Sequence, residues 1–234
     1  ISEVGPRDGL QNISTVMPTA VKKAWIAAES AAGVREIEVG SFVPAKLLPQ
    51  LADTAEIVAF AKTIPDLTVA VLVPNLRGAN DAILAQADKI TLPLSVSESH
   101  SLANLRRTHD QVIEEATRIA ATIASLPEGK RPHFEGSLST VFGCTIEGAI
   151  PEFQILRLAE RLMEAGCDEV GLSDTTGYAD PHAVKHMVKA VRGVVGDRAL
   201  TGIHLHRRHV FKKALNLTLT HQLFVLGQKG DHLG

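Results

Sequence analysis

The stretch SEVGPRDGLQN at residues 2–12 decides between the two folds that the rest of the chain allows. It begins as a short strand candidate at residues 2–5 and continues as the turn GPRDGLQN at residues 5–12. An open dinucleotide-binding sheet would carry phosphate-cradling glycines in the turn after its first strand. Arg7 and Asp8 stand in that place here. The turn therefore favours a barrel over an open, doubly wound sheet.

Strand and helix patterns alternate along the chain downstream of this turn. Further strand candidates lie at residues 36–40, 68–73, 89–94, 133–140, 168–173 and 200–206. Amphipathic helical segments separate them, and such alternation implies a parallel sheet covered by helices. With the first strand, this makes seven βα-type units within residues 1–206. We therefore predict an α/β protein with one domain, residues 1–234, folded as a (β/α)8 TIM barrel whose last βα unit is truncated or atypical.

Two of the predicted helices are marked by specific sequence patterns, an N-cap in one and an apolar stripe in the other. Asp180-Pro181 is typical of an N-cap residue followed by proline at the first helical position. A long helix is predicted by an apolar stripe that comprises Leu105, Val112, Ala116, Ile119, Ile123 and Leu126. The charged pairs Arg106-Arg107 and Glu114-Glu115 in the same region are interpreted as solvated helix faces.

Composition and charge exclude several classes of protein. The chain has 24 Lys and Arg against 26 Asp and Glu, a net charge of −2, which gives no electrostatic footprint for nucleic acid or an anionic membrane. No apolar run is long enough to span a bilayer, and the N-terminus has no signal-peptide pattern. Two cysteines, Cys144 and Cys167, do not make a disulfide framework. We therefore expect no nucleic-acid or membrane partner, and a location in the cytoplasm or an organelle matrix rather than secretion.

Polar residues at strand ends are the candidates for chemistry, because barrel active sites form at the carboxyl ends of the strands. In the seventh strand, alternation sends His204 and His206 to the same face, where they could form a compact bidentate metal site. Asp8 can add a carboxylate oxygen, and such mixed ligands suit Mg2+, Mn2+ or Fe2+. Arg7 and Asp8 alone could be an ordinary solvated loop, and a lone histidine an ordinary structural residue. The combination favours a metal site.

Six motifs, taken in order, resemble those of 3-hydroxy-3-methylglutaryl-CoA lyases. They are GPRDGLQN (5–12), IEVGSFV (37–43), PNLRG (74–78), FGCTIEG (142–148), LSDTTG (172–177) and HLH (204–206). The first is the most specific, because related Claisen-type synthases typically carry RDGEQ where Leu10 here gives RDGLQ. The resemblance implies a TIM barrel, a divalent cation (Mg2+ or Mn2+), an acyl-CoA substrate and, as the suggested assembly, a homodimer.

The resemblance also implies roles for single residues. Asp8, His204 and His206 would hold the metal, and Arg7 would polarise the substrate carbonyl. The residues implied to line or brace the substrate pocket are Gln11, Glu38, Ser41, Asp174 and Thr175.

Several of these residues also have a plain structural interpretation. Glu36 and Glu38 share a face of the second strand, and either could be a charge near a sheet end, an interpretation that is favoured for Glu36. Ser41 could equally be a turn residue or a helix cap. Asp174 is interpreted as an orienting group that holds the residues in contact with substrate or metal.

The implied reaction is a retro-Claisen cleavage of 3-hydroxy-3-methylglutaryl-CoA to acetyl-CoA and acetoacetate. A base removes the tertiary hydroxyl proton, the C–C bond breaks, and the acetyl-CoA enolate is stabilised until it is protonated. A metal ion would lower the pKa of the hydroxyl group, and Arg7 would stabilise the charge that grows on the thioester oxygen. His204 is the candidate general acid/base, although a metal-bound imidazole cannot act as a free base at the same time.

The final residues depart from the family pattern. After the counterpart of His206 the family continues with Asp-Thr, a helix and, later, a glycine-rich loop that carries a catalytic cysteine. An asparagine beyond that helix is the remaining metal ligand. Here Arg207-Arg208 follows, and residues 207–234 contain no matching loop, cysteine or asparagine. A frameshift, a truncation or an ending peculiar to this protein would each explain the divergent tail. Two cations beside the ligands would weaken metal binding if they pointed inward.

These observations leave two classes of function open. The leading hypothesis is a metal-dependent hydroxyacyl-CoA lyase, with a related lyase or aldolase acting on another hydroxyacyl-CoA or 2-hydroxy acid as a close alternative. The second class is a catalytically impaired barrel, which the divergent tail motivates.

Overall fold

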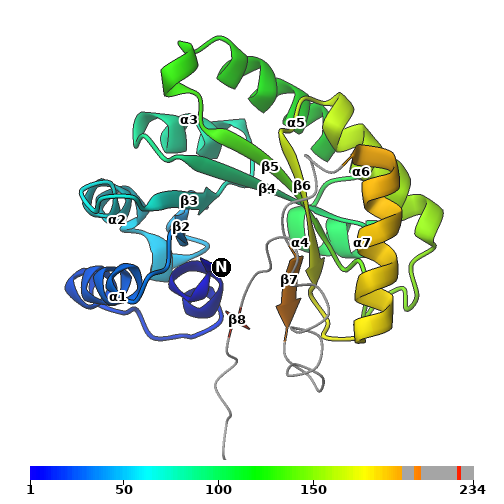
Figure 1. The fold of residues 1–234 in the computed structure, drawn as a ribbon, viewed down its shortest axis with the longest axis horizontal. Coiled ribbons are helices and arrows are strands. Elements are labelled where there is room, and N and C mark those ends of the chain that lie inside the picture. Colours follow the sequence, from blue (N-terminus) through cyan, green and yellow to red (C-terminus); the bar gives the residue numbers. More distant parts are fainter. Residues whose placement is uncertain (197–202, 207–225, 228–234) are drawn as a thin grey trace, which may run out of the picture.

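The fold is an all-parallel sheet wrapped by helices, seen in a computed structural model that describes residues 1–196, 203–206 and 226–227. In these ranges eight strands form one sheet, hydrogen-bonded in chain order. They are β1 (Ser2–Glu3), β2 (Glu36–Ser41), β3 (Thr68–Leu72), β4 (Lys89–Ser95), β5 (His133–Ser139), β6 (Glu169–Asp174), β7 (Ile203–His206) and β8 (Leu226–Gly227). Figure 1 shows the sheet curving from β2 round to β7.

The connections between the strands are largely helical. The described helices are the π-helix η1 (Gly5–Gly9), α1 (Thr19–Ala31), η2 (Pro49–Leu51), α2 (Thr54–Ala61), α3 (Leu76–Leu84), α4 (Glu98–Leu105), α5 (His109–Ala124), η3 (Glu128–Lys130), α6 (Glu152–Glu164) and α7 (Pro181–Val195). In Figure 1 the helices α1, α2, α3, α5, α6 and α7 cover the outside of the curved sheet. Within the described ranges, no helix combines the length and the apolar character that a membrane crossing needs.

The strands are parallel and are hydrogen-bonded in chain order, and this arrangement confirms the predicted barrel class. The first strand is shorter than predicted, because the chain leaves the sheet after Glu3 and enters η1 at Gly5. Of the divergent tail at residues 207–234, the structure describes only β8. The truncated or atypical last unit and the single domain therefore stay predictions.

Strand β4 separates an apolar outer face from a polar inner face. In β4, Ile90, Leu92 and Leu94 are buried in the core that the sheet forms with the helices. Full burial of such a side chain contributes about 1.5–3 kcal/mol. Alternation places Lys89 and Thr91 on the opposite face, inside the curve of the sheet. The outer face therefore supplies stability, and the inner face is left for polar groups.

The predicted long helix with the stripe at residues 105–126 is two helices, so this prediction was wrong in its detail. α4 ends where Arg106 adopts a left-handed backbone, with φ 55°. α5 then starts with a capping box, in which the Thr108 side chain accepts from the Gln111 N–H and the Gln111 side chain accepts from the Thr108 N–H. Such reciprocal bonds satisfy the free N–H groups of a helix start, so they specify a new helix at this point.

The interpretation of Glu114-Glu115 as a solvated pair holds for Glu114 and is wrong for Glu115. Glu114 is exposed, whereas Glu115 is 5% exposed. The Glu115 carboxylate accepts a hydrogen bond from the Leu76 N–H at the start of α3 and pairs with Arg118. A buried carboxylate at a helix N-terminus compensates the partial positive charge there, so Glu115 ties α5 to α3.

A layer of charged side chains lies at the start of the central strands. Lys89 Nζ lies 2.9 Å from Glu135 Oε2 and 3.0 Å from Glu169 Oε2, and Glu36 Oε1 is 3.8 Å away. Glu169 Oε2 is also 2.7 Å from His133 Nε2. Burial lowers the pKa of Lys89, but Glu135 and Glu169 outweigh this and raise it, so the ammonium stays charged.

A β-bulge interrupts β2 between Glu38 and Gly40, where the register against β3 shifts by one residue. The bulge turns the Gly40 Cα towards α2: a Cβ on Gly40 would lie 2.5 Å from Thr54 Oγ1. That hydroxyl is itself fixed by Ser41, whose N–H donates to it at 3.1 Å and whose carbonyl accepts from it at 3.0 Å. Only glycine fits between this strand and helix α2.

We expect Gly40→Ala to destabilise the protein by about 1–3 kcal/mol, because the added methyl group overpacks the contact with Thr54. Gly129→Ala is the matched control, since a Cβ there meets nothing within 4 Å, and it should change stability by less than about 0.5 kcal/mol. Urea unfolding followed by circular dichroism measures both. Equal stability of the two variants would contradict the packing described.

The His133–Glu169 pair should make stability depend on pH. The hydrogen bond to Glu169 is the main reason that the pKa of His133 is raised. A raised folded-state pKa stabilises the fold below the unfolded-state pKa, and this contribution is lost as the pH rises through the folded-state value. His133→Gln should therefore lower the Tm more at about pH 5.5 than at about pH 8.5, on either side of an ordinary histidine pKa. The exposed His182→Gln is the control, and an equal loss at both pH values would exclude the linkage.

Candidate active site at the carboxyl ends of the strands

The π-helix η1 places Arg7 and Asp8 directly after the first strand. The Arg7 and Asp8 N–H groups both donate to the Val4 carbonyl, at 3.0 and 2.6 Å, and Pro6 occupies the first turn, where no N–H is needed. Short π-helical segments are frequent at functional sites. This one buries Arg7 to 8% exposure and Asp8 to 6%.

A cluster of hydrogen-bonded charges forms around Arg7. Arg7 Nε is 2.5 Å from Glu38 Oε2, and Arg7 Nη1 is 3.0 Å from Asp8 Oδ1. Gln11 Nε2 donates to the same Asp8 oxygen at 2.8 Å. The structure thus brings together four residues that the sequence predicts for the site: Arg7, Asp8, Gln11 and Glu38. The interpretation of Glu38 as a charge near a sheet end does not account for this direct pairing.

Burial and pairing act in opposite directions on the ionisation of this cluster. Burial lowers the pKa of Arg7, but the charges of Glu38 and Asp8 outweigh it, so the pKa is raised and the guanidinium stays charged. Burial also raises the pKa of Glu38, while the attraction of Arg7 opposes that rise. A permanent cation is therefore held at the strand ends by two carboxylates.

The bulge in β2 determines where Ser41 points. Ser41 pairs with Leu72, and Glu38 pairs with Ala70, two residues earlier in β3. Side chains aligned across parallel strands share a face, so Ser41 lies on the same inner face as Glu38, although the two are three residues apart. The Ser41 Oγ is buried and has no hydrogen-bond partner among the described residues. Ser41 therefore lies further along the Glu38 face of β2, with a buried hydroxyl group that has no partner among the described residues.

Asp174 and Thr175 fasten loops at the end of β6. The Asp174 carboxylate accepts from the N–H groups of Tyr178 and Ala179, at 2.9 and 3.1 Å, and the residue is 2% exposed. Thr175 Oγ1 accepts from the Thr140 N–H at 2.9 Å. Both predicted residues therefore brace the strand ends, and the structure places neither in the hydrogen-bonded cluster around Arg7.

Thr140, which directly follows β5, links the strand ends in a way that the sequence pattern does not reveal. It has φ 60°, a left-handed conformation that costs a β-branched residue of order 1–3 kcal/mol. Its hydroxyl lies 2.9 Å from Ser95 Oγ and accepts from the Ser97 N–H at 3.3 Å. Together with the bond from the Thr140 N–H to Thr175 Oγ1, these bonds join the ends of β4, β5 and β6. No propensity rule points to a threonine in this conformation, so only the structure could identify it.

The predicted metal ligands are described only in part. His204 and His206 lie on β7, where His204 pairs with Ser173 of β6 and His206 pairs with Gly227 of β8. Their side chains lie outside the described residues. β8 in turn lies against η1, so the backbone of β7 is one strand away from the segment that carries Asp8.

The side chains at the strand ends can be compared with the ligands that a divalent cation needs. Within the described residues no group of three His, Cys, Asp or Glu side chains could hold a metal ion. Asp8 offers a buried carboxylate, and the strand order brings two histidines to the same end of the barrel. A carboxylate with two imidazoles fits Mg2+ or Mn2+ and leaves coordination positions for a substrate.

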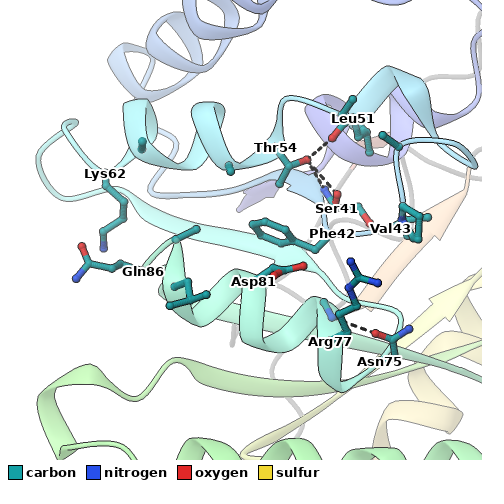
Figure 2. A pocket seen from close by; sticks show the side chains of 18 residues that line it. Ser41, Phe42, Val43, Leu51, Thr54, Lys62, Asn75, Arg77, Asp81 and Gln86 are labelled. Carbon is teal, nitrogen blue, oxygen red and sulfur yellow. Dashed lines mark hydrogen bonds between the residues drawn. The ribbon is translucent and has the colours of Figure 1, made fainter.

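A cavity of about 840 Å3 lies away from this cluster, between α2 and α3. Figure 2 shows Phe42 between the two helices and Arg77 at the start of α3. Ser41 lines it together with Phe42, but Arg7, Asp8 and Glu38 do not. The cavity is therefore not the chamber around the charged cluster.

We expect Glu38→Gln to destabilise the protein by up to about 3–5 kcal/mol, because it removes a charge that compensates the buried Arg7. Glu36→Gln, on the same face of the same strand but 3.8 Å from its nearest cation, should cost less than about 1 kcal/mol. Urea unfolding of both variants measures the difference. A larger loss in Glu36→Gln than in Glu38→Gln would contradict the pairing.

Comparison with known proteins identifies the family. The profile of the HMGL-like family matches residues 1–210. The mitochondrial hydroxymethylglutaryl-CoA lyase of Arabidopsis thaliana is 36% identical over 206 residues, which are 88% of this chain and 43% of that protein. The cytoplasmic 3-hydroxy-3-methylglutaryl-CoA lyase of Rattus norvegicus is also 36% identical, over 88% of this chain and 59% of the relative. The chain thus spans about half the length of these relatives.

Solved structures agree with this assignment. An HMG-CoA lyase from Acinetobacter baumannii, in complex with coenzyme A and 3-methylmalate, superposes with a TM-score of 0.80 at 38% identity, over 88% of this chain and 65% of that one. The hydroxymethylglutaryl-CoA lyase of Pseudomonas aeruginosa gives 0.80 at 33% identity, over 87% and 66%. From its fold, its motifs and these relatives, the chain belongs to the HMGL-like family of carbon–carbon lyases.

Proposed function

We propose that this protein is the barrel part of a divalent-metal-dependent lyase that cleaves 3-hydroxy-3-methylglutaryl-CoA to acetyl-CoA and acetoacetate. The observation that carries the proposal is the buried cluster of Arg7, Asp8 and Glu38 at the carboxyl ends of the strands. Charge of this kind, kept at a strand end rather than in solvent, is typical of a barrel active site. The membership of the HMGL-like family supports the choice of reaction.

An acyl-CoA with a tertiary hydroxyl group is the proposed substrate. The related lyase from Acinetobacter baumannii was solved with coenzyme A and a hydroxydicarboxylate, 3-methylmalate. A substrate that combines these two parts has a thioester, a hydroxyl group and a carboxylate. The inner face of this barrel offers a cation in Arg7 and an unused hydroxyl in Ser41 for such groups.

Arg7 is the residue proposed to stabilise the developing negative charge. Cleavage of the C–C bond leaves an enolate whose charge rests on the thioester oxygen. A guanidinium group that is already oriented by Glu38 and Asp8 needs no reorganisation when this charge appears.

Asp8, His204 and His206 are the residues that would hold a divalent cation, Mg2+ or Mn2+. When bound, such an ion would act as a Lewis acid that lowers the pKa of the substrate hydroxyl. Gln11 donates to Asp8 Oδ1 and so fixes the orientation of that carboxylate. The fit rests on Asp8 in the described part and on the strand positions of the two histidines.

Proton transfer is assigned to His204 as the candidate general acid/base. Its position on β7, paired with Ser173 of β6, suits this role, but the imidazole could serve as a free base only while it is not bound to metal. Asp174 and Thr175 are proposed to keep the neighbouring loops in place, as their hydrogen bonds to the backbone indicate.

Two alternatives remain distinct from this proposal. A related lyase would use the same cluster on another hydroxyacyl-CoA, whereas an impaired barrel would fold and show no turnover because the family's cysteine loop is not found in residues 207–234. Named relatives are mitochondrial or cytoplasmic, and we propose one of these settings, cytoplasm or organelle matrix, here. A homodimer is the proposed assembly.

The test is release of acetyl-CoA and acetoacetate from 3-hydroxy-3-methylglutaryl-CoA with Mg2+ or Mn2+, followed by a coupled assay. We expect turnover that chelation abolishes and that Arg7→Met lowers by about 10²–10³-fold in kcat, the usual effect of removing a charge-stabilising donor. Asp8→Asn should lose metal-dependent turnover as well. Asp81→Asn, an exposed aspartate in α3, is the matched control.

The outcome separates the alternatives. A folded, metal-loaded protein that turns over another hydroxyacyl-CoA would reassign the substrate. One that turns over no branched hydroxyacyl-CoA at all would refute the lyase proposal.

A further inference from the structure

One side chain holds both main-chain hydrogen-bonding groups of Ser41. The Ser41 N–H donates to Thr54 Oγ1 at 3.1 Å, and the Ser41 carbonyl accepts from the same hydroxyl at 3.0 Å. Figure 2 shows these bonds between the start of α2 and the end of β2. β1 pairs with β2 only at Glu36 and Ile37, so within the described ranges no strand of the sheet lies beside Ser41 on that edge. The Thr54 hydroxyl thus takes the place of a neighbouring strand.

These two bonds fix the direction of the Ser41 side chain. The N–H and the C=O belong to the two rigid peptide planes that meet at the Ser41 Cα, and these planes determine where Cβ points. The Ser41 Oγ is buried and has no hydrogen-bond partner of its own among the described residues. Buried hydroxyl groups without a partner are uncommon, and binding of a ligand is one reason to keep them. The direction of this hydroxyl depends on the main chain, and hence on Thr54.

Packing alone does not hold the end of β2. The cavity of about 840 Å3 between α2 and α3 is lined by Ser41, Phe42 and Thr54. Atoms that line a cavity lack packing partners on that side. The hydrogen bonds to Thr54 are therefore the contacts that keep this part of the strand from shifting.

The Thr54 hydroxyl is itself held in place by its surroundings. Thr54 is 3% exposed, and its Oγ1 lies 2.7 Å from the Leu51 carbonyl. A hydroxyl group has one proton, so Oγ1 donates to the carbonyl of Leu51 or of Ser41 while it accepts from the Ser41 N–H. The preceding residue, Asp53, is tied to α1, because Lys22 Nζ lies 2.6 Å from Asp53 Oδ1. The start of α2 is thus anchored from both sides.

We propose that Thr54 is a positioning residue for substrate binding: its hydroxyl fixes the Ser41 main chain and so directs the Ser41 hydroxyl towards the bound substrate. This inference rests on the proposed lyase function, in which Ser41 offers a hydroxyl to a polar group of the substrate. It deepens that function by adding the residue that orients Ser41. Thr54 acts through its bonds to Ser41 and not by contact with the reacting atoms.

The kinetic test compares Thr54→Val, which keeps the shape of the side chain, with Thr54→Ser, which keeps the hydroxyl. Thr54→Val should raise KM for 3-hydroxy-3-methylglutaryl-CoA by about 3–10-fold with kcat within about twofold, because one hydrogen bond is lost from ground state and transition state alike. Thr54→Ser should keep KM within about twofold of the wild type. The matched control is Thr63→Val, whose exposed hydroxyl donates to the Phe60 carbonyl, and it should leave KM unchanged.

A double-variant cycle shows whether Thr54 acts through Ser41. Ser41→Ala removes the hydroxyl that Thr54 is proposed to direct. Adding Thr54→Val to Ser41→Ala should change KM by less than about twofold, because two substitutions that remove the same interaction are not additive. If Thr54→Val raises KM by its full factor in the Ser41→Ala background as well, the effect is merely structural and the inference is overturned.

A second readout does not depend on turnover. Titration calorimetry with Mg2+ present measures binding of 3-hydroxy-3-methylglutarate, the free acid of the proposed acyl group. We expect weaker binding in Thr54→Val, Ser41→Ala and the double variant, equal among the three, and wild-type binding in Thr54→Ser. If this pattern is found but the wild type releases no acetyl-CoA, the proposed reaction fails while the positioning of Ser41 by Thr54 stands. A wild type that neither binds the acid nor turns over the thioester would overturn both.

The folding of Thr54→Val is checked first by circular dichroism, because the substitution leaves the Ser41 N–H without its acceptor. If this variant does not fold, Gly40→Ala takes its place: the added Cβ would lie 2.5 Å from Thr54 Oγ1 and so displaces the hydroxyl while Thr54 stays intact. Unchanged KM and unchanged binding of the acid in the folded variant would overturn the inference, as would a loss in Thr54→Ser equal to that in Thr54→Val.

Discussion

The structure depends on one electrostatic constraint: a buried guanidinium must be compensated, and Arg7 is compensated by Glu38 at 2.5 Å and Asp8 at 3.0 Å. Removing a cation and its partners from water costs several kcal/mol per ion, so the pairing must be held in place by the fold. Two irregular elements do this. The π-helix η1 turns Arg7 into the barrel, and the bulge in β2 keeps Glu38 and Ser41 on one face.

The two faces of the sheet have different roles: the outer face stabilises the fold, and the inner face carries the charged groups. The outer faces bury aliphatic side chains such as Ile90 and Leu92 against the helices, and this burial supplies the folding free energy that a polar interior does not. The inner faces carry charges, from the Lys89 layer up to Arg7 at the strand ends. In a loop after β5, the buried Thr140 keeps a strained left-handed conformation through bonds to neighbouring strand ends.

Periodicity and short motifs in the sequence predict the order of strands and helices and part of the candidate site. The alternation of strand and helix patterns predicts the parallel barrel, and the structure joins Arg7, Asp8 and Gln11 of the RDGLQ motif by hydrogen bonds. The two errors have different causes. The break after Arg106 is marked by a local pattern, the capping box formed by Thr108 and Gln111, which the continuous apolar stripe hides. The burial of Glu115 depends on its contact with the start of α3, which no local pattern contains.

The hydrogen-bond and ion-pair partners of the buried polar residues also could not be predicted from the sequence. The bulge that aligns Ser41 with Glu38 adds a single residue to a strand whose composition looks regular, and the pairing of Lys89 with Glu135 joins different strands. The proposed roles of His204 and His206 rest on strand positions and on family resemblance.

The most direct test of the proposed reaction is 13C NMR of 3-hydroxy-3-methylglutaryl-CoA, labelled across the bond to be cleaved, during incubation with the protein and Mg2+. Retro-Claisen cleavage at the Arg7 cluster predicts loss of the one-bond carbon coupling and equal amounts of acetyl-CoA and acetoacetate. Retention of that coupling, with an intact substrate or with free coenzyme A from thioester hydrolysis alone, would contradict it.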